Sequence, residues 1–153
     1  MSWGFLGSGA SEQIEVSFTL PSDIFSGLGF NCTSSKMCDM IVGNGGGDNP
    51  PYLEDYFEVE GDRAPHTDVS LGGTYDLSVV SLSYEDYATT VRFRRLLDTK
   101  DVWDARIYKA PTDMVYAWCG GSFCVDKESA HTPGDWEIFN VDLSGKDSME
   151  RDA

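Results

Sequence analysis

Short runs in which apolar and polar residues alternate, separated by turns rich in glycine and proline, constrain this chain most. In residues 14–20, IEVSFTL, every second residue is apolar, which is the period of a strand buried on one face. The same period in residues 88–96 places Val91, Phe93 and Arg95 on one face. Further strands are expected at residues 24–30, 39–43, 52–59, 75–82, 114–118 and 136–141.

Helical signals are scarce, and a single turn over residues 99–104, capped by Asp98 or Thr99, is the one helix that we expect. Many short strands joined by turn-rich loops predict an all-β sandwich or barrel. The 153 residues suit one domain. We expect a flexible, Gly/Ser-rich segment over residues 1–11, a domain over residues 12–145 and a polar tail over residues 146–153.

The charge balance is strongly acidic, with 11 Lys and Arg residues against 26 Asp and Glu residues and a net charge of −15. Such a surface repels nucleic-acid phosphates and anionic membranes, which leaves cationic partners, dissolved cations or simple solubility as its role. No apolar run is long enough to span a bilayer. The first residues lack the features of a signal peptide, so we expect either a cytosolic protein or a leader outside this chain.

Four cysteines fall into two local pairs, Cys32 with Cys38 and Cys119 with Cys124. Neither pair has the C-x-x-C spacing of a zinc ribbon or a thioredoxin. We expect each pair to close a short loop as a disulfide, which favours an oxidising compartment; four reduced, buried thiols are the alternative. Asn31 begins an N-x-S/T glycosylation acceptor, which matters only in a secretory compartment.

The sequence contains no G-x-S-x-G, H-E-x-x-H or P-loop motif. Asp48, in the glycine-rich residues 44–51, is a candidate calcium ligand, although the EF-hand pattern is absent.

The histidines and one methionine suggest a more specific function, the binding of haem iron. His66 and His131 are the two histidines, and Met37 directly precedes the expected strand at residues 39–43. A His–Met pair holds haem iron in electron-transfer proteins. No C-x-x-C-H motif occurs, so such a haem would be bound non-covalently. An exposed histidine and a methionine that fills the core are the ordinary alternatives.

Four segments, in order, resemble the DOMON domain family, which includes haem-binding modules attached to redox and membrane domains. They are SGLGFNCTSSKMCDMIVG (residues 26–43), Tyr56 with the turn at residues 65–68, VRFRRLLDTKDVWD (residues 91–104), and VYAWCGG followed by HTPGDWEIFNVDL (within residues 115–143).

This resemblance implies an antiparallel immunoglobulin-like β-sandwich that binds haem b. The axial ligands of haem-binding members correspond to Met37 and His131. Met40 is a rival ligand, but it lies inside a strand on the face opposite Asp39 and Ile41, so we expect it in the core. Other expected haem contacts are pocket walls at Phe30, Tyr116 and Trp118, and a propionate partner at Arg94 or Arg95.

We therefore expect an extracytoplasmic b-type cytochrome module, not a complete enzyme, that relays single electrons to an attached redox or membrane domain or to a redox partner protein. The alternative is a haem-free module of the same fold that binds sugar or calcium or has a structural role. In that case exposed aromatic rings would stack on sugars, the candidates being Trp3, Trp103, Trp136 and the tyrosines.

Overall fold

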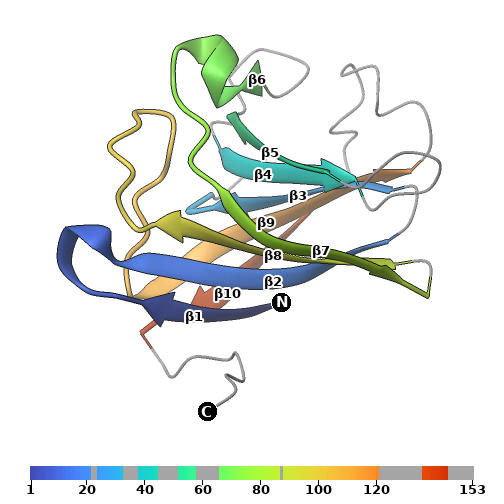
Figure 1. The fold of residues 1–153 in the computed structure, drawn as a ribbon, viewed down its shortest axis with the longest axis horizontal. Coiled ribbons are helices and arrows are strands. Elements are labelled where there is room, and N and C mark those ends of the chain that lie inside the picture. Colours follow the sequence, from blue (N-terminus) through green and yellow to red (C-terminus); the bar gives the residue numbers. More distant parts are fainter. Residues whose placement is uncertain are drawn as a thin grey trace.

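The computed structural model describes residues 1–21, 24–32, 38–44, 52–57, 66–86, 88–120 and 136–144, whose strands form two antiparallel sheets (Figure 1). Sheet A has the strand order β1 (Ser2–Leu6), β2 (Gln13–Pro21), β8 (Ala88–Leu96), β7 (Ser78–Glu85). Sheet B has the order β10 (Trp136–Asp142), β9 (Pro111–Gly120), β3 (Ile24–Phe30), β4 (Asp39–Asn44), β5 (Tyr52–Phe57), β6 (His66–Thr67).

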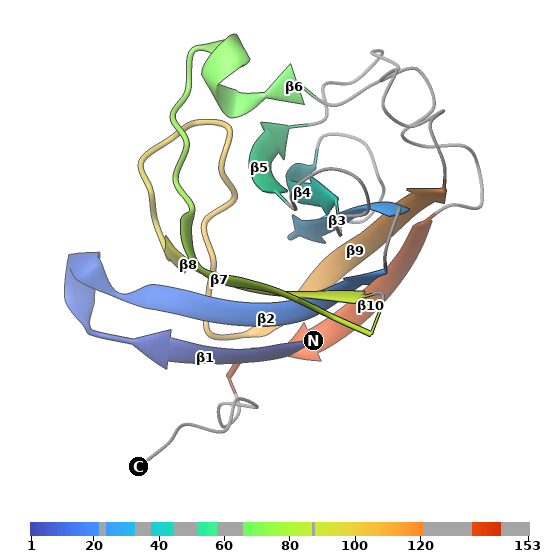
Figure 2. The same ribbon diagram turned by 45° about the vertical axis from the view of Figure 1, so that its right-hand side comes forward.

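The two sheets lie one above the other as the layers of a β-sandwich (Figure 2). Alternation along each strand sends one set of side chains between the layers. That inner set includes Val16 and Phe93 of sheet A and Leu28, Phe30 and Ile41 of sheet B, each exposed by 2% or less. The all-β, antiparallel sandwich expected from the sequence is confirmed.

The expectation of a flexible segment over residues 1–11 is wrong, because Ser2–Leu6 forms β1 and pairs with β2. Trp3, opposite Val16, is 6% exposed and packs into the core. The short 3-10 helix η1 (Gly9–Ser11) then turns the chain into β2, and Gly7 and Gly9 adopt positive φ values of 78° and 63° at this turn. The two aromatic residues of SWGFL therefore outweigh the Gly/Ser composition around them.

Two other local expectations need correction. The strand expected at residues 75–82 is displaced to β7, Ser78–Glu85, because Tyr75 and Asp76 are bound to β5 instead: the Tyr75 hydroxyl donates to the Leu53 carbonyl and the Asp76 N–H to Asp55. Residues 99–104 form no helix. Side-chain oxygens there accept backbone N–H groups locally, Asp101 from Trp103 for example, and such bonds compete with a helix.

The loop of residues 97–110 closes one end of the sandwich, since Ile107 is 3% exposed in the core and its N–H donates to the Leu97 carbonyl. Near it, the second 3-10 helix η2 (Asp68–Leu71) follows β6. Neither 3-10 helix, nor any other helix in the described ranges, has the length and apolar character needed to cross a membrane.

Candidate functional site

The face of sheet B that points away from sheet A, called here the outer face, carries an apolar cluster over β3, β4 and β9. Because Leu28 and Phe30 point between the sheets, the alternating Gly27 and Gly29 belong to the outer face. Their neighbours there form a second buried cluster, called here the outer cluster, in which each residue is 3% exposed or less: Cys32, Cys38, Met40, Val42 and Val115, with Tyr56 packed against it.

Glycine is required on β3 because neighbouring side chains occupy the space where a Cβ atom would lie. A Cβ at Gly29 would collide with Cys38 Sγ and lie 2.9 Å from Cys32 Sγ, and a Cβ at Gly27 would lie 2.9 Å from the Met40 methyl. The two glycines therefore allow the disulfide and Met40 to lie directly on the backbone of β3.

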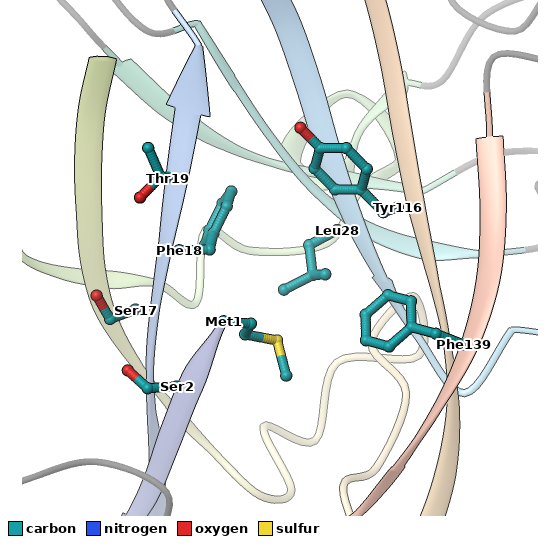
Figure 3. A pocket seen from close by; sticks show the side chains of 8 residues that line it. All are labelled: Met1, Ser2, Ser17, Phe18, Thr19, Leu28, Tyr116 and Phe139. Carbon is teal, nitrogen blue, oxygen red and sulfur yellow. The ribbon is translucent and has the colours of Figure 1, made fainter. Parts of the chain in front are cut away.

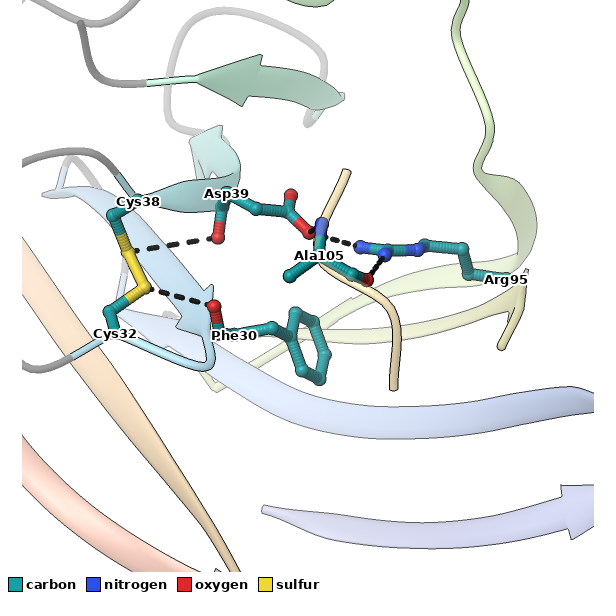
Figure 4. Close-up of a disulfide and its surroundings, with 6 residues drawn as sticks. All are labelled: Phe30, Cys32, Cys38, Asp39, Arg95 and Ala105. Atoms are coloured by element: carbon teal, nitrogen blue, oxygen red, sulfur yellow. Dashed lines mark hydrogen bonds and ion pairs between the residues drawn. A yellow bond between two sulfur atoms is a disulfide. The ribbon is translucent and has the colours of Figure 1, made fainter. Parts of the chain in front are cut away.

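The Cys32–Cys38 disulfide expected from the sequence is present (Figure 4). It fixes the ends of the β3–β4 connection on the outer face, beside Met37 in the sequence. The expected Cys119–Cys124 disulfide stays a prediction, because the side chain of Cys119 and the whole of Cys124 lie outside the described residues.

Arg95, an expected haem contact, lies between the sheets and has a fully buried side chain. One guanidinium nitrogen is 2.6 Å from Asp39 Oδ2, which also accepts the Ala105 N–H at 2.8 Å, and the other donates to the Ala105 carbonyl (Figure 4). Burial disfavours the charged guanidinium, but Asp39, Asp104 and Asp55 outweigh it and raise the pKa of Arg95. Arg95 is thus a charged structural residue that ties β8 to β4.

Arg94 lies on the opposite face of β8, where its Nε donates to Glu15 at 2.7 Å. Phe30 points between the sheets, with Arg95 5.6 Å from its ring centroid. The structure brings Phe30 and Arg95 together. None of Phe30, Arg94 and Arg95 lies on the outer face of sheet B.

Tyr116 lines a pocket of about 590 Å³ between the sheets (Figure 3). Phe18 comes from β2, Leu28 from β3 and Phe139 from β10, and Met1 and Ser2 also line the pocket. The pocket is on the inner side of sheet B, separated from the outer cluster by the sheet itself.

Several expected site residues lie outside the described residues: Met37, His131 and Asp48, with the side chains of Trp118 and Trp136. His66 is half-buried in β6, opposite Phe57. Asn31, the glycosylation candidate, is exposed and adopts a positive φ of 53° at the end of β3. Met40 is buried as expected, with 1% exposure, but it lies in the outer cluster and not in the core between the sheets.

The fold has counterparts among known proteins. The sequence profile of the DOMON domain matches residues 1–119. This chain belongs to the DOMON domain family. A solved structure, the cytochrome domain of Myriococcum thermophilum cellobiose dehydrogenase, superposes with a TM-score of 0.59 at 10% identity, covering 88% of this chain and 67% of that one. Curated protein sequences give no match to the chain.

In this DOMON domain the outer cluster is what the sequence analysis missed. Its signal was present in the alternation of Gly27 and Gly29 with Leu28 and Phe30, since small residues on one face of a strand mark a close approach. The partners that approach them, from β4 and β9, follow only from the strand register.

Proposed function

We propose that this chain is a haem-binding DOMON module, a b-type cytochrome that relays single electrons, with Met37 and His131 as the axial ligands. The observation that carries the proposal is the outer face of sheet B. It carries a buried apolar cluster on a glycine-flattened stretch of β3, beside the disulfide that anchors Cys38, the neighbour of Met37. The shared fold with a cytochrome domain supports the same reading.

The strand register sets a condition on the ligand pair. The β3–β4 connection leaves β3 at Phe30, whereas the β9–β10 connection leaves β9 at Gly120, opposite Ile24 at the other end of β3. Ligation by both residues therefore requires His131 to lie back over the sheet toward Met37.

The chain is long enough to meet that condition. The register puts Cys38 and Trp136 about 13 Å apart along the strands and about 14 Å apart across three strand spacings. The five residues from His131 to Trp136 reach about 17 Å when extended. The two separations combine to about 19 Å, and the histidine and methionine side chains would supply the rest, so the length of the chain supports ligation by both residues.

The donor set suits electron transfer. When bound, the haem would supply a one-electron couple, and a thioether ligand raises its potential. With Met37 and His131 both bound to the iron, no position would remain for a substrate, so the module would pass electrons without binding a reactant at the metal. The outer cluster would exclude water on one side of the group; Met40 and Val42 are its nearest apolar side chains to Gly27.

The partner would be an attached redox or membrane domain or a separate redox protein. The net charge of −15 favours a cationic docking surface on that partner. The buried Cys32–Cys38 disulfide supports an extracytoplasmic location, where Asn31 could be glycosylated.

Absorption spectra of the purified chain test the cofactor. We expect a red protein, or one that becomes red on haem titration, whose visible bands sharpen when dithionite is added. A protein that stays colourless after haem titration would favour the haem-free ligand-binding or structural module instead. The pocket lined by Phe18, Leu28, Tyr116 and Phe139 is the place where such a module could take an uncharged ligand.

Sugar stacking on Trp3 is excluded by its burial, and Trp103 is half-buried against Phe57 with its indole N–H donating to the Leu71 carbonyl. These two rings therefore support the haem-free, sugar-binding module less than the sequence suggested.

Four substitutions test the ligands. His131→Ala should abolish the low-spin spectrum and His66→Ala, its matched control, should not. Met37→His should retain six-coordinate iron and lower the potential, because imidazole replaces a thioether. Met40→Leu should be nearly silent, since it conserves volume in a buried cluster. A shift with Met40→Leu and none with Met37→His would reverse the ligand assignment.

A further inference from the structure

A group of five aspartates, called here the aspartate cluster, lies where β4, β5, η2 and the loop of residues 97–110 meet. It contains two sets of three carboxylates, each with oxygens within 4.8 Å of one another: Asp39, Asp55 and Asp104 form one set, and Asp68, Asp101 and Asp104 form the other. Asp104 belongs to both sets. The cluster lies apart from the outer cluster, since Asp39 and Asp55 occupy strand positions that point between the sheets.

Several of these oxygens have no hydrogen-bond partner among the described residues. Asp68 is 0% exposed and neither of its oxygens has a donor. Asp55 is 1% exposed; one oxygen accepts the Asp76 N–H at 2.9 Å and the other has no partner in the described part of the chain. Asp39 Oδ1 and Asp104 Oδ1 are also buried without a hydrogen-bond partner in the described part of the chain.

Such an arrangement leaves negative charge uncompensated. Arg95 is the cation that the described residues bring here, and its guanidinium is already bound by Asp39 and the Ala105 carbonyl. Thr99 donates its hydroxyl to Asp104 Oδ2 at 2.6 Å, which satisfies one oxygen without adding positive charge. Buried carboxylates without a partner are strongly disfavoured in their charged form, so these groups must either take up protons or be balanced by a bound cation.

We propose that the aspartate cluster binds a hard divalent cation of the calcium class, with Asp104 as the central ligand. Carboxylate oxygens are the ligands that Ca²⁺ prefers, at 2.3–2.6 Å. Oxygens on opposite sides of such an ion lie up to about 5 Å apart, whereas the shorter bonds of Mg²⁺ limit that separation to about 4 Å. Carboxylate oxygens that all lie within 4.8 Å of one another can therefore contact one ion of the calcium size.

The ligands come from elements far apart in the sequence. Asp39 is in β4, Asp55 in β5, Asp68 in η2, and Asp101 and Asp104 are in the loop that closes the sandwich. A bound cation would therefore hold that end of the sandwich together. The five aspartates do not include Asp48, the calcium candidate from the sequence, and their role does not depend on whether haem is bound.

Terbium luminescence and thermal unfolding test the site in the full chain. Tb³⁺ replaces Ca²⁺ at oxygen sites and emits when a nearby indole absorbs. Trp103 lies beside the cluster, since its backbone N–H donates to Asp101 Oδ1 at 3.0 Å. We expect saturable emission on indole excitation that Ca²⁺ displaces and that Mg²⁺ displaces less well. Saturating Ca²⁺ should also raise the Tm by roughly 5–10 °C over the chain in EDTA.

Asp104→Asn should abolish both the emission and the Ca²⁺-dependent rise in Tm. Its control is Asp86→Asn, which removes the same charge from an exposed turn between β7 and β8 and should leave both unchanged. Asp68→Asn gives a second test that should not cost folding: it removes a buried carboxylate without a donor, so the Tm in EDTA should rise while the Ca²⁺ response is lost.

Two results would overturn the proposal. The first is a wild-type chain with neither emission nor a change in Tm. The second is Ca²⁺ binding that Asp104→Asn and Asp68→Asn leave at wild-type strength, which would assign the ion to other acidic residues.

Discussion

The Arg95 guanidinium is fully buried, and its charge balance depends on Asp39 of another sheet. A buried ion pair contributes little net stability when intact, because desolvation offsets the attraction, but removing one partner leaves the other charge unpaired. The pair is therefore a point where a single substitution has a large effect.

We predict that Arg95→Met lowers the free energy of unfolding by about 3–5 kcal/mol, measured by urea denaturation. Arg94→Met, one residue away, removes an ion pair whose arginine is 43% exposed and should cost less than about 1 kcal/mol. Equal losses in the two variants would contradict the structural role assigned to Arg95.

The aspartate cluster predicts an unusual pH dependence when divalent cations are removed with EDTA. Burial, with repulsion from neighbouring aspartates, raises the pKa of Asp68 to about 9, and burial raises that of Asp55 to about 7, from 3.8. Between pH 3.8 and these raised pKa values, the folded chain binds more protons than the unfolded chain. The free energy of unfolding therefore falls as the pH rises over this range. Thermal unfolding should give a lower Tm at pH 9 than at pH 5.

Asp68→Asn should remove the part of that decline between pH 7 and pH 9, whereas Asp86→Asn should not. A Tm that rises over this pH range in EDTA would show that the carboxyl groups of the cluster are ionised when the chain is folded.

At the scale of the strands, β3 depends on glycine. We predict that Gly29→Ala lowers the free energy of unfolding by about 1–3 kcal/mol, because the added methyl meets both sulfur atoms of a disulfide that cannot move away. Gly27→Ala should cost less, since its first neighbour is the methyl end of the flexible Met40 side chain. Denaturation under non-reducing conditions compares the two, and the opposite order would count against this packing.

Strand β1 gives a further prediction. Trp3→Ala should cost about 3–5 kcal/mol, because a buried indole leaves a large cavity. Tyr84→Ala in β7, where the ring is 48% exposed, is the matched aromatic control and should have a much smaller effect in chemical denaturation. A silent Trp3→Ala would support the flexible N-terminal segment that the sequence suggested.

The strands that the sequence predicts best are those with one buried face. Residues 88–96 coincide with β8, because buried and more exposed residues alternate there without interruption. Residues 24–30 coincide with β3, although residues 27–30 are buried on both faces. β1 escaped prediction because glycine separates its two aromatic residues. Arg95 was assigned to the correct face of its strand, but its partner Asp39 is 56 residues away, and no local pattern indicates such a pairing.

At the scale of the whole molecule, the sandwich class follows from the number of short strands, whereas the strand order does not. The aspartate cluster shows the limit for the sites. The sequence analysis treated the acidic residues only as a total charge, since such residues are usually exposed. Only the meeting of β4, β5, η2 and the loop of residues 97–110 brings these five together.

The strand pairing also has a consequence for synthesis of the chain. β2 pairs with β8, Gln13 opposite Leu96, and β3 pairs with β9, Ile24 opposite Gly120. At about 5–20 residues per second a ribosome needs roughly 4–15 s between β2 and its partner. During that time Leu28 and Ile41 have no opposing layer from β8, so the nascent chain presents apolar strands with free edges, the kind of surface that chaperones bind and that aggregates when they do not.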